Sequence, residues 1–321
     1  MKLMFWNIFK VGSGKLKRKL GAVVASNGLG NNIQDYVVKV ALGDAVWSKA
    51  TSTTPVDVFV IIEVVSGGYQ KDTAGYGSCL RVLQALKAAM NVAVGNTAYV
   101  YDYVPPKVIG TKECVGVIYN TKALTYVSGQ AVRNTAGNFI LPRTAFWAKF
   151  TRSGKPLNIV GIHGPTSNPT SGDYKDAVTF TNNLGQVAQF NQSALTPKQD
   201  TCIGGDYNCD PLNSYSKKVN TKTQKITAFA DLTTAYNYKI TLPNGTLSSV
   251  RQGIDSSKTP PADYLSQPYD NIVFRLPSQT TDPPVKLVDL IGKSTIYTTN
   301  LVACFNAARV VSDHLPLTIS F

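Results

Sequence analysis

The sequence from Ile203 to Pro211 reads IGGDYNCDP and follows the residues Thr201 and Cys202. If this lead-in is a strand, side chains two residues apart share a face, which places Asp206 and Asn208 together at its end. The two glycines allow a close approach of backbone or ligand. Two oxygen-bearing side chains in this position suit a hard cation or a phosphate, although a Gly-Asp-x-Asn turn is also ordinary turn chemistry.

The rest of the chain has an ordinary composition but a strong excess of positive charge. Its 321 residues are 43% hydrophobic, a length that allows a sizeable core in one large or two medium domains. Thirty-two Lys plus Arg against nineteen Asp plus Glu give a net charge of +13. A chain this basic points to a polyanionic partner, either nucleic acid or an anionic membrane surface.

The sequence shows no clear targeting segment and no cysteine spacing typical of a metal site. The N-terminal KLMFWNIF is too short for the apolar region of a signal peptide and predicts a first strand, and no apolar run is long enough to span a bilayer. The five cysteines show no metal-binding spacing, which favours reduced, buried thiols over the alternative of a Cys202–Cys209 disulfide. We therefore expect a monomer without stable membrane association, cytoplasmic or exported without a cleaved N-terminal signal.

Strand and helix patterns alternate along the chain, and several strands are adjacent in sequence. No hinge-like linker interrupts them, which favours one α/β domain over residues 1–321. The glycine-rich, basic region Lys10–Asn31 is expected to be a solvated loop or short helix, or else to contact a phosphate backbone. The predicted strands are Lys2–Phe9, Asp57–Val65, Ala98–Val104, Cys114–Tyr119, Ala123–Val127, Ala145–Phe150, Leu157–Ile162, Thr201–Gly205, Asn271–Arg275 and a final strand after His314. The predicted helices are Ile33–Lys49, Cys79–Met90 and Lys175–Gln192, and a hairpin at Asn244-Gly245 joins Ile240–Leu242 to Thr246–Ser248.

Polar residues gather at the ends of these strands, where ligands bind in α/β sheets. Both of the chain's histidines are in the set, and histidine is the side chain best suited to moving protons near neutral pH. Glu63 interrupts the apolar run VFVIIEVV, where a carboxylate is costly to bury unless it is paired or binds a cation. Asn7, Glu63, His163, Asp206 and Asn208 come at strand ends, and Asp270, Asp313 and His314 come just before strands.

These residue types define the chemistry. Carboxylates and amides without a thiolate suit Mg²⁺, with Mn²⁺ or Ca²⁺ as alternatives, and argue against zinc. The sequence has no Gly-x-Ser-x-Gly elbow, Walker-type loop or GxGxxG, so hydrolase-triad, NTPase and dinucleotide functions lack support. A cation that polarises a phosphoryl oxygen, together with histidines that move protons, is suited to hydrolysing a phosphate ester.

The ordered set resembles the endonuclease/exonuclease/phosphatase superfamily, and within it most closely deoxyribonuclease I and the nuclease subunit of cytolethal distending toxin. The resemblance runs from Asn7 to Pro316, and its most specific signatures are Gly205-Asp206-Tyr207-Asn208 and Ser312-Asp313-His314-Leu315-Pro316. It implies a four-layer α/β/β/α sandwich of two packed mixed sheets flanked by helices. The 55 residues between Asn7 and Glu63 exceed what the nuclease needs, so the basic segment 10–31 is expected to be an insertion.

The resemblance also implies roles for individual residues. It assigns metal binding to Asn7, Glu63 and Asp313. The histidines at 163 and 314 would flank the scissile phosphate, His163 partnered by Glu113 and His314 by Asp270. The remaining assignments place Asp206 and Asn208 in the phosphate and metal cradle, and Arg143 in contact with a substrate phosphate.

The function implied is a divalent-metal-dependent phosphodiesterase, most simply a DNA endonuclease. In the expected mechanism His314 takes a proton from water and His163 assists the leaving oxygen, although the sequence leaves open which histidine is the base. A phosphoinositide phosphatase or lipid phosphodiesterase is the alternative, although QPYDNIVF lacks the signature of the 5-phosphatases. A catalytically silent binding module is disfavoured because every acidic and histidine position is present.

Overall fold

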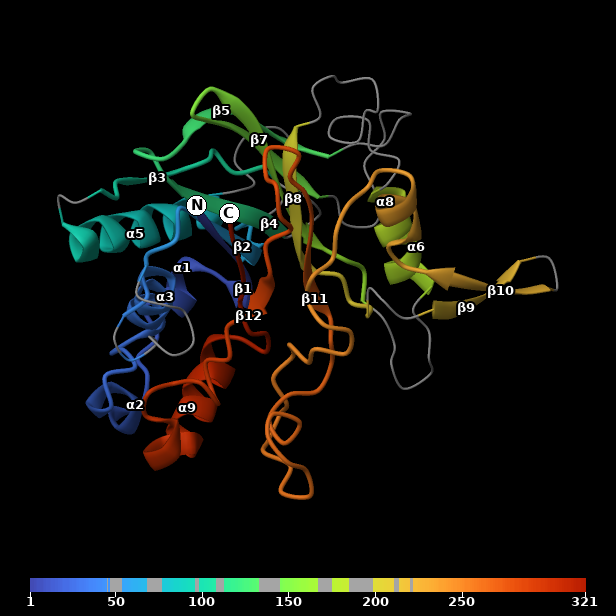
Figure 1. Ribbon diagram of the computed structural model, residues 1–321. Helices are drawn as coiled ribbons and strands as arrows, with labels where there is room; N and C mark the ends of the chain where they lie inside the picture. Colours follow the sequence, from blue (N-terminus) through green and yellow to red (C-terminus); the bar gives the residue numbers. More distant parts are fainter. Residues whose placement is uncertain are drawn as a thin grey trace.

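The first of two large sheets in the computed structural model has the strand order β12-β13-β1-β2-β4-β3 (Figure 1). The structure describes residues 1–44, 46, 54–67, 77–95, 98–107, 113–132, 145–166, 175–184, 199–210, 214–219 and 222–321. Strands β1 and β2 are parallel, and their neighbours are antiparallel to them. The strands are β1 (Lys2–Val11), β2 (Val58–Val65), β3 (Tyr101–Tyr103), β4 (Glu113–Asn120), β12 (Val285–Leu287) and β13 (Leu317–Ser320).

The second sheet has the order β11-β8-β7-β6-β5, with β7 and β8 parallel and the other pairs antiparallel. Its strands are β5 (Thr125–Ala131), β6 (Phe146–Arg152), β7 (Lys155–His163), β8 (Asp200–Asp206) and β11 (Asp270–Arg275). A separate two-stranded ribbon is formed by β9 (Ser214–Val219) and β10 (Lys222–Thr227).

Helices cover the outer faces of both sheets, which completes four layers (Figure 1). The first sheet is covered by α1 (Ser13–Leu16), α2 (Ala22–Ser26), α3 (Ile33–Leu42), α5 (Gly77–Val94) and α9 (Tyr297–Val311). The second is covered by α6 (Lys175–Leu184) and α8 (Ala230–Thr234). The predicted α/β/β/α architecture is confirmed.

The apolar core divides into three clusters, one for each interface between layers. The period-2 alternation of a strand explains this, since Met4 and Trp6 of β1 face the helices while Leu3 and Phe5 face the second sheet. Burying both faces of β1 and β2 is why their sequences are nearly continuous apolar runs.

Two glycines before Asp206 allow close packing around the end of β8. A Cβ added at Gly204 would lie 2.7 Å from the Phe5 ring of the opposite sheet. Gly205 has φ +139°, a conformation open almost only to glycine, and a Cβ there would lie 2.1 Å from the Ile162 carbonyl oxygen. Gly204 therefore allows the two sheets to approach closely, and Gly205 allows β8 to lie close to β7 where the polar residues gather.

Gly205→Ala should destabilise the fold by about 3 kcal/mol or more, because backbone strain and a clash with main chain act together. Gly14→Ala is the matched control, since a Cβ at Gly14 meets nothing within 4 Å. Thermal and urea unfolding of the two variants measures the difference. An unchanged midpoint for Gly205→Ala would contradict the packing described.

Several sequence expectations need correction. Asn244-Gly245 forms a turn but no hairpin, because Ser249 and Val250 beyond it pair instead with His314 and Leu265. The helix expected over Ile33–Lys49 ends at Leu42, where Gly43 adopts a left-handed conformation. Sequence analysis overlooked β9, β10, β12 and α9. The helix predicted for Lys175–Gln192 is described only to Leu184.

The basic region Lys10–Asn31 is not a solvated loop. It forms α1 and α2, and it buries Leu16, Leu20, Val24 and Leu29 in the helix-side core. Its short helices agree with the second form expected from the sequence, and its origin as an insertion stays a prediction. All five cysteines are free and buried, as expected. Within the described ranges, no helix has the length and apolarity to cross a bilayer.

Candidate active site

The polar residues converge at one edge of both sheets. In the second sheet, His163 ends β7 directly beside Asp206 at the end of the parallel strand β8. Asp270 begins the antiparallel strand β11 opposite Asp206, so a residue at a strand start reaches the same edge as residues at strand ends. In the first sheet, Asn7 lies within β1, where its pairing with β2 becomes irregular, and Glu63 lies near the carboxyl end of β2.

One carboxylate oxygen, Asp206 Oδ2, lies at the centre of the cluster. The Asn7 amide Nδ2 donates a hydrogen bond to it at 3.1 Å. His314 Nε2 lies 3.4 Å from the same oxygen and His163 Nε2 lies 3.7 Å from it. Asp206 is 1% exposed. Both imidazoles therefore direct Nε2 toward one point, and a phosphate group bound at this edge of the sheets would be within reach of both.

His314 is held by side-chain and backbone contacts. Its Nδ1 lies 2.7 Å from Asp270 Oδ2, which also accepts a hydrogen bond of 2.6 Å from Ser248 Oγ. The His314 backbone is fixed by Trp6 Nε1, which donates to its carbonyl at 2.9 Å, and by Ser312 Oγ, which accepts from its amide at 3.0 Å. Ser312 Oγ also donates to the Asn7 carbonyl, which joins the C-terminal motif to β1.

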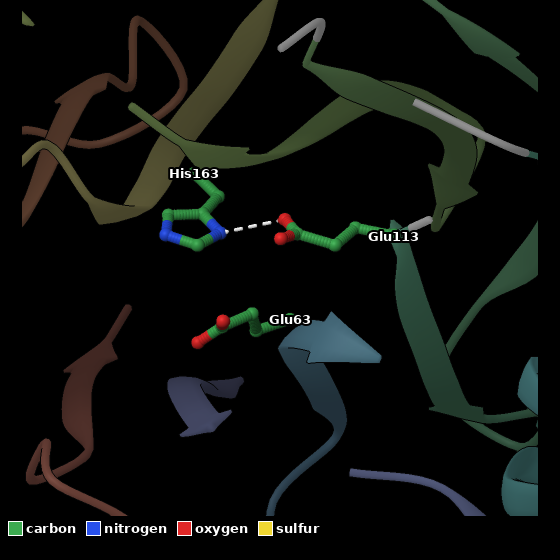
Figure 2. Close-up of side chains that lie close together, drawn as sticks. All are labelled: Glu63, Glu113 and His163. Carbon is green, nitrogen blue, oxygen red and sulfur yellow. Dashed lines mark hydrogen bonds and ion pairs between the residues drawn. The ribbon is translucent and has the colours of Figure 1, made fainter. Parts of the chain in front are cut away.

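His163 forms the second imidazole–carboxylate pair. Its Nδ1 lies 2.9 Å from Glu113 Oε2, and Glu113 begins β4 in the opposite sheet. Figure 2 shows His163, Glu113 and Glu63 converging from β7, β4 and β2. When Glu113 accepts the Nδ1 hydrogen, the lone pair of neutral His163 is on Nε2, the atom facing Asp206.

Glu63 is presented by an irregularity in β2. Its φ is +63°, and the pairing register of β2 shifts between Ile61 and Val64. A bulge of this kind re-aims a side chain, and a strained non-glycine residue is typical of a functional position. Among the described residues, no hydrogen bond or ion pair engages the Glu63 carboxylate, although the residue is only 6% exposed.

The charges around Glu63 fit a divalent cation. Burial raises the pKa of Glu63; His163 opposes the shift, and the carboxylates of Glu113, Asp313 and Asp206 add to it. Asp313 Oδ1 is buried and accepts no hydrogen bond from the described residues. Oxygen ligands whose negative charge is offset only in part, Asp313 Oδ1 by His314 Nε2 at 3.8 Å, suit Mg²⁺, Mn²⁺ or Ca²⁺. Glu63, Glu113 and His163 offer ligand atoms within 4.8 Å of one another, while the assignment of the metal to Glu63, Asp313 and Asn7 stays a prediction.

Asn208 is positioned by a turn, not by the strand. Strand β8 ends at Asp206, whose Oδ1 accepts the Asn208 backbone N–H at 2.8 Å. Asn208 has φ +53°, and its side chain donates to the Gly164 carbonyl. The expectation that Asp206 and Asn208 share a strand face is therefore wrong, because an Asx turn intervenes. Tyr207 points into the core against Phe229.

No protein-family model and no curated protein matches the sequence, whereas solved structures match along nearly the whole chain. The inositol polyphosphate 5-phosphatase domain of SPsynaptojanin, in complex with inositol (1,4)-bisphosphate and calcium ion, aligns with a TM-score of 0.52 at 12% identity, over 99% of this chain and 82% of that chain. An endonuclease/exonuclease/phosphatase family protein from Leptotrichia buccalis gives 0.51 at 13% identity, over 100% and 98%. D. rerio TDP2 complexed with single strand DNA product gives 0.50 at 14% identity, over 99% and 97%. The chain has the fold of the endonuclease/exonuclease/phosphatase superfamily.

Within this superfamily fold, the structure brings together every predicted site residue that it describes. The members are Asn7, Glu63, Glu113, His163, Asp206, Asn208, Asp270, Asp313 and His314. Arg143, the predicted phosphate contact, lies outside the described residues. The catalytic and metal-binding roles of all these residues stay predictions.

Lys15 is a site neighbour that sequence analysis missed. It comes from α1, and its ammonium donates to the backbone carbonyls of Ile8 and Phe9 at the end of β1. Burial lowers the pKa of Lys15 to about 8, and the carboxylates of Asp313 and Glu63 oppose the shift. The sequence signals only a basic run here, with nothing to indicate that this lysine turns inward.

The charge state of His314 is open to direct measurement. Burial lowers its pKa, but the carboxylates of Asp270 and Asp206 outweigh burial and raise the pKa to about 10. A raised folded-state pKa stabilises the fold fully below the unfolded value near 6.5, and this contribution is lost as pH rises through about 10. In chelator-treated protein, NMR should show the His314 imidazole titrating near that upper value, and Asp270→Asn should lower it. Titration of His314 near its ordinary pKa would contradict this assignment.

Proposed function

We propose that the protein is a divalent-metal-dependent phosphodiesterase that hydrolyses DNA. The observation that supports it best is the convergence of two imidazole–carboxylate pairs on Asp206 Oδ2, beside acidic ligands suited to a divalent cation. General acid–base catalysis of phosphate-ester hydrolysis needs one group to accept a proton and another to donate one. The two histidines supply both groups on either side of a single point.

The carboxylates around His314, which raise its pKa, favour roles for the two histidines opposite to those expected from the sequence. His163, with Nδ1 bound to Glu113, would accept the proton of the attacking water at Nε2. His314, kept charged by Asp270, would donate its Nε2 proton to the leaving oxygen. Asn208 carries an amide that would orient the phosphate group. A bound cation would polarise a phosphoryl oxygen and offset the developing negative charge.

The choice of DNA rests on charge. The net charge of +13 favours a polyanion over a single small head group. Part of this charge lies on the β9–β10 ribbon, which projects from the body beside α6 and α8 (Figure 1). The sequences of strands β9 and β10 contain Lys217, Lys218, Lys222 and Lys225 and no acidic residue. A two-stranded ribbon fits the DNA major groove, and lysines bind phosphates.

Replacing these four lysines with glutamine should weaken DNA binding and reduce its salt dependence. Each lost phosphate contact lowers the slope of log K against log [salt] by about 0.9, so four contacts give about 3.6. Fluorescence anisotropy with labelled duplex DNA measures this. The matched control replaces four exposed lysines of the body, Lys122, Lys155, Lys286 and Lys293. An equal loss in both variants would show that the ribbon has no special role.

The second candidate is a phosphoinositide phosphatase or lipid phosphodiesterase. One structural relative is named for an inositol polyphosphate 5-phosphatase domain and another was solved with a DNA product, so the shared fold supports both. Purified protein should be offered supercoiled plasmid, single-stranded DNA, RNA and phosphoinositides, each with Mg²⁺ and with chelator. We expect DNA to be cleaved fastest. Hydrolysis of phosphoinositides alone would overturn the choice of DNA.

A further inference from the structure

A pocket of about 600 Å³ opens beside the candidate active site. Asn208, Asp313 and His314 line it, so it is continuous with the cluster around Asp206. The other lining residues come from the segments 249–253 and 266–269, together with Thr166 and Arg309. The proposed hydrolysis needs one phosphate at the histidines, and this pocket lies beyond that point.

The walls of the pocket are fixed relative to His314. The Val250 amide donates to the Asp313 carbonyl at 2.7 Å, and the Leu315 amide donates to the Ser248 carbonyl at 2.9 Å. Ser249 forms an isolated β-bridge with His314. The pocket and the catalytic histidine therefore belong to one hydrogen-bonded unit.

Two arginines give the pocket its charge. Apart from His314, they are the cations among its described lining residues, and Asp313 is the single carboxylate there. Arg251 Nε donates to the carbonyls of Ala262 and Leu265 at 2.9 and 2.8 Å, which anchors the guanidinium and leaves four Nη hydrogens for other acceptors. Arg309 reaches the pocket from the last turn of α9.

We propose that this pocket binds a second phosphate group of the substrate, held by Arg251 and Arg309 while the scissile phosphate lies at His163 and His314. The inference rests on the proposed function and specifies where the substrate extends. Planar guanidinium groups bind phosphate oxygens in pairs, and an anchored one loses little entropy on binding. In a polynucleotide the second phosphate is the neighbouring phosphodiester; in a phosphorylated inositol it is another ring phosphate.

The test compares substrates that differ by one phosphate. Wild-type protein, Arg251→Gln, Arg309→Gln and the control Lys122→Gln, an exposed lysine on a different surface, are assayed on a dinucleotide and a trinucleotide. The same set is assayed on an inositol monophosphate and bisphosphate. We expect the wild type to prefer the member with the extra phosphate, and each arginine variant to lose about tenfold or more of that preference in KM. If the preference appears with the nucleotides, the second phosphate is a neighbouring phosphodiester. If it appears with the inositol phosphates, the second phosphate is another ring phosphate.

Binding to the same ligands, measured by calorimetry with chelator present, separates the two proposals. A wild type that hydrolyses none of these substrates contradicts the proposed function, while the binding preference still tests the pocket. If the wild type, Arg309→Gln and Lys122→Gln all show the same preference for the substrate with the extra phosphate, the pocket proposal is wrong. The proposed hydrolase activity is not contradicted by that result. Arg309→Gln keeps this test valid even where Arg251→Gln fails to fold, because of the two arginines it is Arg251 whose side chain holds the carbonyls of Ala262 and Leu265.

Discussion

His163→Ala and His314→Ala should each lower kcat for DNA cleavage by about 100- to 10,000-fold, because each removes an imidazole beside Asp206 that is proposed to transfer a proton. The double variant should lose little more than the worse single variant, since groups that act as one unit are not additive. Rates of plasmid nicking with saturating Mg²⁺ measure both effects.

Two controls separate chemistry from folding in these variants. Circular dichroism and thermal unfolding should show that each alanine variant remains folded. Glu113→Gln and Asp270→Asn test the partners, because each keeps the shape of the side chain and removes the charge that holds an imidazole. Plasmid nicking by either histidine variant at nearly the wild-type rate would contradict the proposed mechanism.

Glu63→Gln should raise the Mg²⁺ concentration needed for half-maximal activity by about 100-fold or more. Replacing a residue that only supports a metal ligand commonly costs 10- to 100-fold in affinity, and Glu63 is proposed as a ligand itself. The glutamine keeps the size of the side chain and removes its negative charge. Asp231→Asn, an exposed carboxylate on α8, is the matched control.

Direct binding gives a readout for Glu63 that does not depend on activity. Calorimetric titration of chelator-stripped protein with Mg²⁺ or Mn²⁺ should show binding in the wild type and in Asp231→Asn, with much weaker binding in Glu63→Gln. Equal metal affinity in all three proteins would remove Glu63 from the metal site.

Much of the site was predictable because it depends on where strands end. Apolar runs mark the strands, and the polar residues that follow or precede them must then meet at one edge of the sheets. Composition strengthens the prediction, since both histidines of the chain lie at the site. A count of glutamates supports Glu113 in the same way, because Glu63 and Glu113 are the only glutamates in the sequence.

Other features depend on contacts between distant parts of the chain. The bulge that re-aims Glu63 follows from the register of β2 with its neighbours. The support of His314 by Trp6 joins residues 308 positions apart. Lys15 reaches Phe9 only because α1 folds back on β1. No local pattern predicts such contacts, since they arise when the layers pack.

The central claim is that a divalent cation and two histidines act together on one phosphodiester. Its most direct test uses chelator-stripped wild-type protein and supercoiled plasmid, with Mg²⁺ added back, beside the His163→Ala/His314→Ala double variant. Nicking that is absent in chelator, restored by Mg²⁺ in the wild type and not restored in the double variant is the predicted result. Equal nicking in chelator, or equal restoration in the double variant, would contradict the claim.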